Sequence, residues 1–166
     1  MGSSNRPTGD FDRLWAPWRH ALFTGRRARR CIFCAAKRSR EDRRTYVIAR
    51  GKAVFAILNR FPYNTGHLMI APYRHVSAFE ALTSDEWSGM FRLSRTLLKR
   101  LRTHLHPQGF NVGMNLGKVA GAGIPGHVHL HIVPRWNGDT NFMPLLAHAR
   151  VLSQSLDALQ RILTRA

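Results

Sequence analysis

Residues 126–136 read GHVHLHIVPRW, so that His127, His129 and His131 occupy every second position. In a β-strand, residues two apart point to the same side of the sheet. The three imidazoles therefore share one face, while the valine, leucine and isoleucine between them face the core. The pattern predicts a strand that continues to Val133 and presents a chemically active face.

Further segments have the β-branched and apolar composition of strands, namely residues 46–50, 54–58, 67–72 and 110–115. Gly51 and Lys52 separate the first two segments and predict a hairpin. A glycine-rich loop over residues 117–126 (GKVAGAGIPG) directly precedes the histidines.

A long helix is predicted over residues 83–105. Thr83 and Glu86 have the spacing of a capping box, and Pro107 follows the end of the segment. Apolar side chains recur at three- and four-residue steps and form one stripe: Trp87, Met90, Phe91, Leu97, Leu98 and Leu101. Leucines at similar spacing predict a C-terminal helix within residues 149–163.

The order of these elements indicates the fold class. Strands gather around one long helix without the βαβ alternation of a parallel sheet. We therefore expect an α+β fold, with a mostly antiparallel sheet covered by helix on one face. A chain of 166 residues suffices for one such domain, which we assign to residues 11–166. The polar residues 1–10 are expected to form a disordered tail.

Two features of the sequence bear on location. No apolar run approaches the roughly 18–20 residues that cross a bilayer, so no membrane association is expected. The N-terminus lacks the apolar segment of a secretory signal. We therefore expect a cytoplasmic protein. In that setting, the spacing of Cys31 and Cys34 favours a metal or redox pair over a structural disulfide.

The formal net charge is +17, and basic residues crowd into residues 25–30 (GRRARR) and 37–44 (KRSREDRR). Such a surface attracts polyanions such as nucleic acid, nucleotides or acidic membranes. A solvated basic face is the alternative, because charge favours association without defining a site. Nucleic acid is therefore kept as a possible partner.

Three alternating histidines allow several chemistries. They suit an exposed strand, a three-histidine zinc site, or nucleophilic attack on phosphorus by a neutral imidazole. The loop over residues 117–126 favours the last of these, because glycines let backbone N–H groups approach phosphate oxygens. The loop lacks the Gly-Lys-Ser/Thr sequence of a Walker A motif.

The histidine segment resembles the motif of the histidine triad (HIT) family, in which apolar residues separate and follow three histidines. The resemblance covers residues 31–136 and includes Asn59, Gly66, His67 and Asn115. Residues 14–19 (LWAPWR) and 134–142 (PRWNGDTNF) resemble the dinucleoside-polyphosphate hydrolase and phosphorylase branch. The resemblance implies a HIT-like fold, with a five-stranded antiparallel sheet, and a homodimer.

The resemblance also implies a reaction. His129 would attack the α-phosphorus of a nucleotide and form a nucleotidyl-histidine intermediate, while His131 contacts the phosphate or the leaving group. With histidine at position 131, the chain resembles the hydrolases of the family. Transferases and phosphorylases of the family carry glutamine at this position. We expect hydrolysis of dinucleoside polyphosphates or AMP conjugates. An Ap4A phosphorylase or nucleotidyltransferase is the alternative. A nucleic-acid adenylate hydrolase or a nucleic-acid-binding module is less favoured.

Substrate-binding residues follow from the same resemblance. Asn59 would bind the ribose, Asn115 an α-phosphate oxygen, and Ile57 and Met69 would line the base pocket. One position departs from the family pattern. Many HIT hydrolases carry serine or threonine three residues before the first histidine, where this chain has Ile124.

The side chain of Ile124 has no hydrogen-bond donor. Backbone N–H groups of Gly123 and Ile124 would have to bind the phosphate in its place, unless the leaving group is handled differently.

A structural zinc site is implied as well. Its four ligands would be Cys31, Cys34, His75 and His127. His127 would then anchor the start of the strand and so position His129. His67 would support this arrangement by an outer-shell hydrogen bond. Without the metal, His67 and His127 would instead bond to each other.

Overall fold

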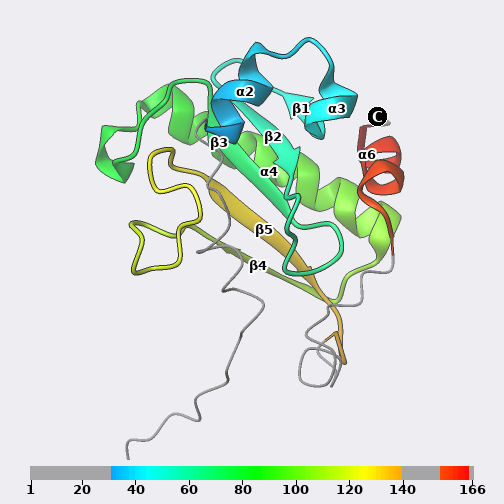
Figure 1. Ribbon diagram of the computed structural model, residues 1–166. Coiled ribbons are helices and arrows are strands. Elements are labelled where there is room, and N and C mark those ends of the chain that lie inside the picture. Colours follow the sequence, from blue (N-terminus) through cyan, green and yellow to red (C-terminus); the bar gives the residue numbers. More distant parts are fainter. Residues whose placement is uncertain (1–30, 140–153, 165–166) are drawn as a thin grey trace, which may run out of the picture.

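The computed structural model describes residues 31–139 and 154–164 (Figure 1). The expected tail, residues 1–10, and the first residues of the C-terminal segment, 149–153, lie outside these ranges. Along the chain the elements are α2 (Ile32–Arg38), α3 (Asp42–Thr45), β1 (Val47–Arg50), β2 (Val54–Leu58), β3 (Leu68–Pro72), η2 (Phe79–Ala81), α4 (Ser84–Leu105), β4 (Gly109–Gly113), β5 (Leu130–Arg135) and α6 (Leu156–Thr164).

The strands form one antiparallel sheet in the order β1-β2-β3-β5-β4. This confirms the α+β fold with a five-stranded antiparallel sheet. In the register of the sheet, Ile57 pairs with Met69, and Met69 pairs with His131. Paired residues of antiparallel strands project to the same face, so these three side chains share one side of the sheet.

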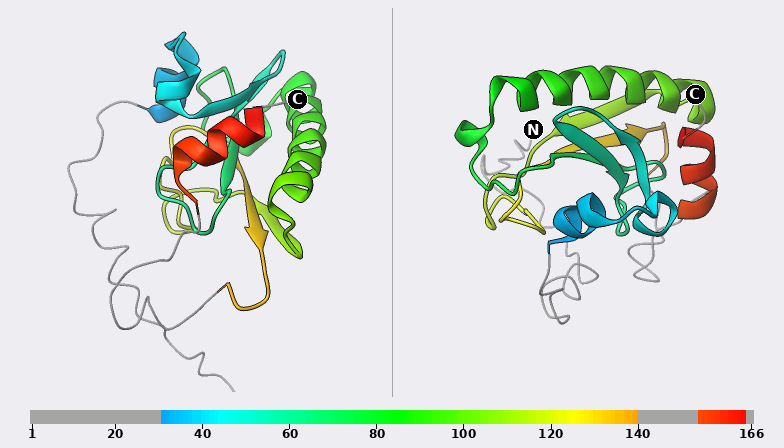
Figure 2. Two further views of the ribbon diagram at one scale, coloured as in Figure 1. Left: turned by 90° about the vertical axis from the view of Figure 1, so that its right-hand side faces the viewer. Right: turned by 90° about the horizontal axis from the view of Figure 1, so that it is seen from above.

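Helix α4 covers one face of the sheet along its length (Figure 2). The predicted capping box is present, because the Glu86 amide donates to the Thr83 hydroxyl and the Thr83 amide donates to the Glu86 carboxylate. Met90, Leu97 and Leu101 are buried against the strands. These three members of the predicted stripe therefore face the core, whereas Phe91, which was predicted to belong to it, is 70% exposed.

The opposite face of the sheet is also partly covered, which corrects the expectation of helix on one face. A second, smaller core lies there beneath α2, which Figure 2 shows across the sheet from α4. Strands β2 and β3 are buried at every residue. Strands buried on both faces have continuous apolar sequences, and these two have such sequences. The core contains Phe33, Ala36, Val47, Phe55, Ile57, Met69 and Ala71.

The histidine strand begins later than predicted. Strand β5 starts at Leu130, so His127 and His129 precede it. In the continued register, Val128 would face Pro72 of the neighbouring strand, and proline has no N–H to donate. The Val128 carbonyl therefore has no donor across the sheet, and the Val128 amide donates to the carbonyl oxygen of Val76 at 2.7 Å rather than to that of Pro72, which pairs with His127 Nε2.

The C-terminal helix α6 packs beside β1 and α4. Leu159 and Leu163 are buried in the larger core. The Gln160 amide donates to the carbonyl oxygens of Asp42 and Val47 at 2.7 and 3.0 Å. These contacts hold the first strand of the sheet in place. None of the helices in the described residues is long and apolar enough to span a bilayer.

Gly66 connects the loop after β2 to His67 and has a left-handed φ of +75°. A Cβ at this position would lie 2.7 Å from Leu105 Cδ1 and 3.2 Å from Pro134 Cγ. The chain therefore passes here with no room for a side chain, in a conformation that favours glycine.

We predict that Gly66→Ala lowers the free energy of unfolding by roughly 3 kcal/mol, because it combines a strained φ with an overpacked contact. Gly113→Ala is the control, since a Cβ there meets nothing within 4 Å. Denaturant unfolding of both variants tests this. Equal losses in the two would contradict the packing argument.

Candidate functional site

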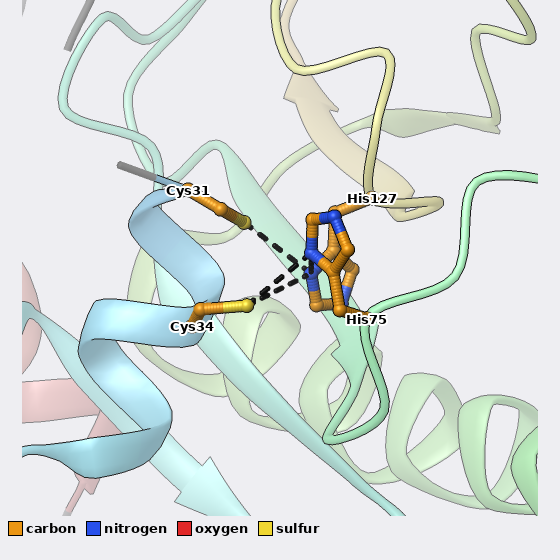
Figure 3. Close-up of side chains that lie close together, drawn as sticks. All are labelled: Cys31, Cys34, His75 and His127. Carbon is orange, nitrogen blue, oxygen red and sulfur yellow. Dashed lines mark hydrogen bonds between the residues drawn. The ribbon is translucent and has the colours of Figure 1, made fainter. Parts of the chain in front are cut away.

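Four possible metal ligands meet on one side of the sheet (Figure 3). The ligand atoms of Cys31, Cys34, His75 and His127 all lie within 4.8 Å of one another. Cys31 directly precedes α2 and Cys34 lies in its first turn, while His75 follows β3. The Sγ of Cys31 is 3.3 Å from Nδ1 of His127, and the Sγ of Cys34 is 3.3 Å from Nδ1 of His75. The structure thus brings the predicted ligand set together.

The spacing fits one tetrahedral metal ion. For zinc, bonds of about 2.0–2.1 Å to nitrogen and 2.3 Å to sulfur give ligand–ligand distances of about 3.3–3.8 Å. The two Nδ1 atoms of His75 and His127 are 3.2 Å apart, and Cys34 Sγ is 3.9 Å from His127 Nδ1. A mixed sulfur and nitrogen donor set of this size is typical of structural metal sites.

The protonation of His127 suits this role. Its Nε2 lies 2.9 Å from the carbonyl oxygen of Pro72 and donates to it, which leaves the lone pair of Nδ1 for a metal. Burial lowers the pKa of His127 to about 4, so the imidazole is neutral at pH 7. Burial raises the pKa of the Cys31 thiol, so binding of a cation would have to release its proton.

His129 is buried beside this cluster, with 4% of its surface exposed. Its Nδ1 donates to the carbonyl oxygen of His127 at 2.7 Å, which leaves the lone pair on Nε2. Burial lowers the pKa of His129, which favours the neutral imidazole. A neutral ring with an available nitrogen lone pair is the form required of a nucleophile.

A hydrogen-bonded chain fixes the opposite tautomer at His131. The Tyr63 amide donates to Nδ1 of His67 at 3.0 Å, so the proton of His67 is on Nε2. That Nε2 donates to Nδ1 of His131 at 2.9 Å, which places the His131 proton on Nε2. Within the described residues, this buried Nε2 has no hydrogen-bond partner. His131 therefore offers an unused donor next to His129.

The partner of His67 corrects one expectation. His67 bonds to His131, whereas it was expected to orient His127 as an outer-shell partner or, without the metal, to bond to His127 directly. Register explains the difference, because Met69 pairs with His131 and His67 lies two residues before Met69 on the same face. His127 lies beyond the other end of β3, next to Pro72.

Phe33 is the buried residue that the sequence analysis missed. Its ring centroid lies 4.9 Å from those of both His127 and His129. The sequence predicts a metal or redox role for the two cysteines of Cys-Ile-Phe-Cys and no role for Phe33. The available signal was the position of an aromatic residue between two predicted metal ligands. A residue in that position lies close to the other predicted ligands, here His127.

The asparagines take local partners. Asn59 accepts a hydrogen bond from the Phe61 amide at 2.9 Å, and its Nδ2 lies 3.4 Å from His67 Nδ1. The predicted strand over residues 110–115 ends at Gly113, so Asn115 lies just beyond it, where its Nδ2 donates to the Gly121 carbonyl at 3.5 Å. The ribose and phosphate roles of the asparagines stay predictions.

The remaining candidates lie on the face that carries His131. Ile57 and Met69 are each 3% exposed in the smaller core, and Ile124 packs against that core. The N–H groups of Gly123 and Ile124 take no hydrogen-bond partner among the residues that the structure describes. They are therefore available to a ligand, although no ligand role is shown for any of these residues.

The burial of His131 predicts a pH effect on stability. Burial, with a smaller contribution from His129, lowers the pKa of His131 from its ordinary 6.5 to about 4. Between these values the unfolded chain binds a proton that the folded chain does not. The free energy of unfolding should therefore fall as the pH drops from 6.5 to 4, by up to about 1 kcal/mol per pH unit from this group.

Denaturant unfolding over pH 4–8 tests this expectation in wild type and His131→Asn. The variant should show a shallower slope below pH 6.5, and the two curves should run parallel above pH 7. Identical slopes between pH 4 and 6.5 would contradict it.

Comparison with known proteins agrees with this geometry. The family model described as HIT domain matches residues 40–138. A Mycobacterium tuberculosis protein named AP-4-A phosphorylase is 38% identical over 159 residues, which cover 91% of this chain and 82% of that protein.

Solved structures show the same fold. A zinc-bound histidine triad family protein from Mycobacterium smegmatis superposes with a TM-score of 0.63 at 27% identity, over 81% of this chain and 90% of that one. The diadenosine triphosphate hydrolase of Plasmodium falciparum, at 19% identity, shares the fold with a TM-score of 0.57 over 71% of each chain. The chain belongs to the HIT domain family.

Proposed function

We propose that the protein is a nucleotide hydrolase that cleaves dinucleoside polyphosphates or AMP conjugates at the α-phosphate. The observation that supports this best is the pair of complementary tautomers. His129 has a lone pair on Nε2, and His131 has an unused proton on Nε2. One is suited to attack an electrophile and the other to donate to an oxygen.

The reaction would proceed in two displacements. Nε2 of His129 attacks the α-phosphorus, the bond from phosphorus to the leaving-group oxygen breaks, and a nucleotidyl-histidine forms. The Nε2 proton of His131 stabilises the departing oxygen. Water then attacks the same phosphorus, releases the nucleoside monophosphate and returns the free imidazole of His129.

Substrate would be held around these two rings. The free N–H groups of Gly123 and Ile124 would bind phosphate oxygens in place of a serine or threonine hydroxyl. Asn115 would assist at the phosphate and Asn59 at the ribose. Ile57 and Met69 would lie beneath the base in a largely apolar pocket.

Phosphorolysis of the same substrates is the second candidate. It is supported by the 38% identity with the protein named AP-4-A phosphorylase. Histidine at position 131 supports hydrolysis instead. The two reactions share the attack by His129 and differ in the acceptor, which is water in one and inorganic phosphate in the other.

We further propose that Cys31, Cys34, His75 and His127 hold a structural zinc ion. Its contribution would be to fix α2 and the start of the histidine segment relative to each other.

A homodimer is proposed as well, since β4 is an edge strand whose Asn111 and Val112 are exposed. The cytoplasmic location and the binding of nucleic acid stay predictions.

Product analysis tests the proposed reaction. Wild-type protein is incubated with Ap3A, Ap4A, an AMP-phosphoramidate and adenylylated DNA, with and without inorganic phosphate. We expect AMP from the nucleotides irrespective of phosphate. His129→Ala should lower kcat on the order of 10⁴-fold or more, with the fold intact by circular dichroism. Phosphate-dependent ADP would establish phosphorolysis instead, and near-normal turnover by the variant would refute the nucleophile.

Metal analysis tests the zinc site. Wild type should carry about one zinc per chain, and His75→Ala should lose most of it because three ligands bind less tightly than four. His104→Ala is the matched control, since His75 and His104 are both exposed histidines and His104 lies outside the cluster. Freshly purified wild-type protein without zinc would refute the site.

A further inference from the structure

Phe33 occupies the centre of the site without being a metal ligand or a candidate to contact phosphate. Its side chain is fully buried, and its ring lies tilted by 49° against His127 and by 42° against His129. Phe55 supports it from behind in an edge-on contact, with ring centroids 6.4 Å apart. Both imidazoles thus rest on one aromatic side chain of α2.

His129 needs such a support for geometric reasons. Its Nδ1–H bond to the His127 carbonyl fixes which nitrogen keeps the lone pair. A single hydrogen bond leaves the ring plane free to tilt. The rings that flank His129 are Phe33, at 4.9 Å, and His131, at 4.7 Å. In the proposed reaction His131 also contacts the substrate, whereas Phe33 does not. Phe33 is therefore the flanking ring whose contact with His129 can serve orientation alone.

We propose that Phe33 is a positioning residue for His129, holding its imidazole in the orientation required for attack on the α-phosphorus. The inference rests on the proposed function. It assigns a role to the residue between the two cysteines and explains why that residue is aromatic. A misplacement of about 1 Å at a reacting atom lowers a rate by as much as 100-fold, so a loosened ring affects turnover strongly.

The location of Phe33 also couples it to the metal cluster. Cys31 and Cys34 lie on either side of Phe33 in the chain, so the contacts that hold the two sulfur atoms also hold the ring against His129. The orientation of the nucleophile is therefore set twice from the same cluster, once through the His127 carbonyl and once through Phe33.

The test compares Phe33→Leu with Phe55→Leu. Both residues are phenylalanines, both are fully buried in the smaller core, and only Phe33 lies against the histidines. We expect similar shifts of the unfolding midpoint and unchanged zinc content in both variants. Only Phe33→Leu should lower kcat, by about 10- to 100-fold, with KM changed less than about 3-fold.

A second variant and a spectroscopic readout keep the inference testable if Phe33→Leu does not fold. Phe33→Met replaces the planar ring with a flexible unbranched chain that adapts to the space left by the ring, and it should show the same loss of kcat. Nuclear Overhauser contacts between the ring protons of His129 and His131 report the orientation of the His129 imidazole. Wild type and Phe55→Leu should show the same contacts, and the Phe33 variants should weaken or lose them.

Three results would overturn the inference. One is an equal kcat in the Phe33 and Phe55 variants, and another is a rise in KM at unchanged kcat, which would make Phe33 a substrate contact. If wild type turns over no nucleotide, the proposed function fails. The NMR spectrum of the imidazoles then tests on its own whether Phe33 orients His129. Unchanged contacts between the His129 and His131 rings in the Phe33 variants are then the third overturning result.

Discussion

The Pro72 carbonyl is the group on which both halves of the site depend. In a continued ladder between β3 and β5 it would accept from the Val128 amide, but that amide donates to the Val76 carbonyl, and Pro72 itself has no N–H to donate. The Pro72 carbonyl then accepts the proton of His127 Nε2. His127 is thereby turned toward the cysteines, and its own carbonyl is left to accept from His129. One backbone acceptor thus helps to give a candidate metal ligand and a candidate nucleophile, two residues apart, their different orientations.

Three chemically identical side chains acquire different roles through their hydrogen-bond partners. A backbone carbonyl fixes the proton of His127 on Nε2 and that of His129 on Nδ1, whereas His67 fixes the proton of His131 on Nε2. Burial lowers the pKa of all three and keeps them neutral near pH 7. Neutrality is necessary here, because the roles depend on which nitrogen carries the single proton.

The features predicted correctly from the sequence are those that local patterns determine. Thr83 and Glu86 fix the start of α4, and alternation places His131 on the face that carries Met69. The quartet around Cys31 joins residues far apart in the chain and was predicted from the family resemblance instead. The late start of β5 depends on Pro72, on another strand, and the partner of His67 depends on register between strands. The position of Phe33 depends on how α2 docks. Such contacts join residues far apart in the chain, so they cannot be predicted from the short-range periodicity of the sequence.

The metal cluster also has a consequence for the order in which the chain folds. Cys31 and His127 are separated by 96 residues, and closing so long a loop costs chain entropy before any contact repays it. A growing polypeptide offers a metal ion only two sulfur atoms at first. The complete set of four residues comes together only when His127 has reached its position beside His75. A metal ion held by all four of these residues would therefore mark molecules in which the histidine segment has reached its final position.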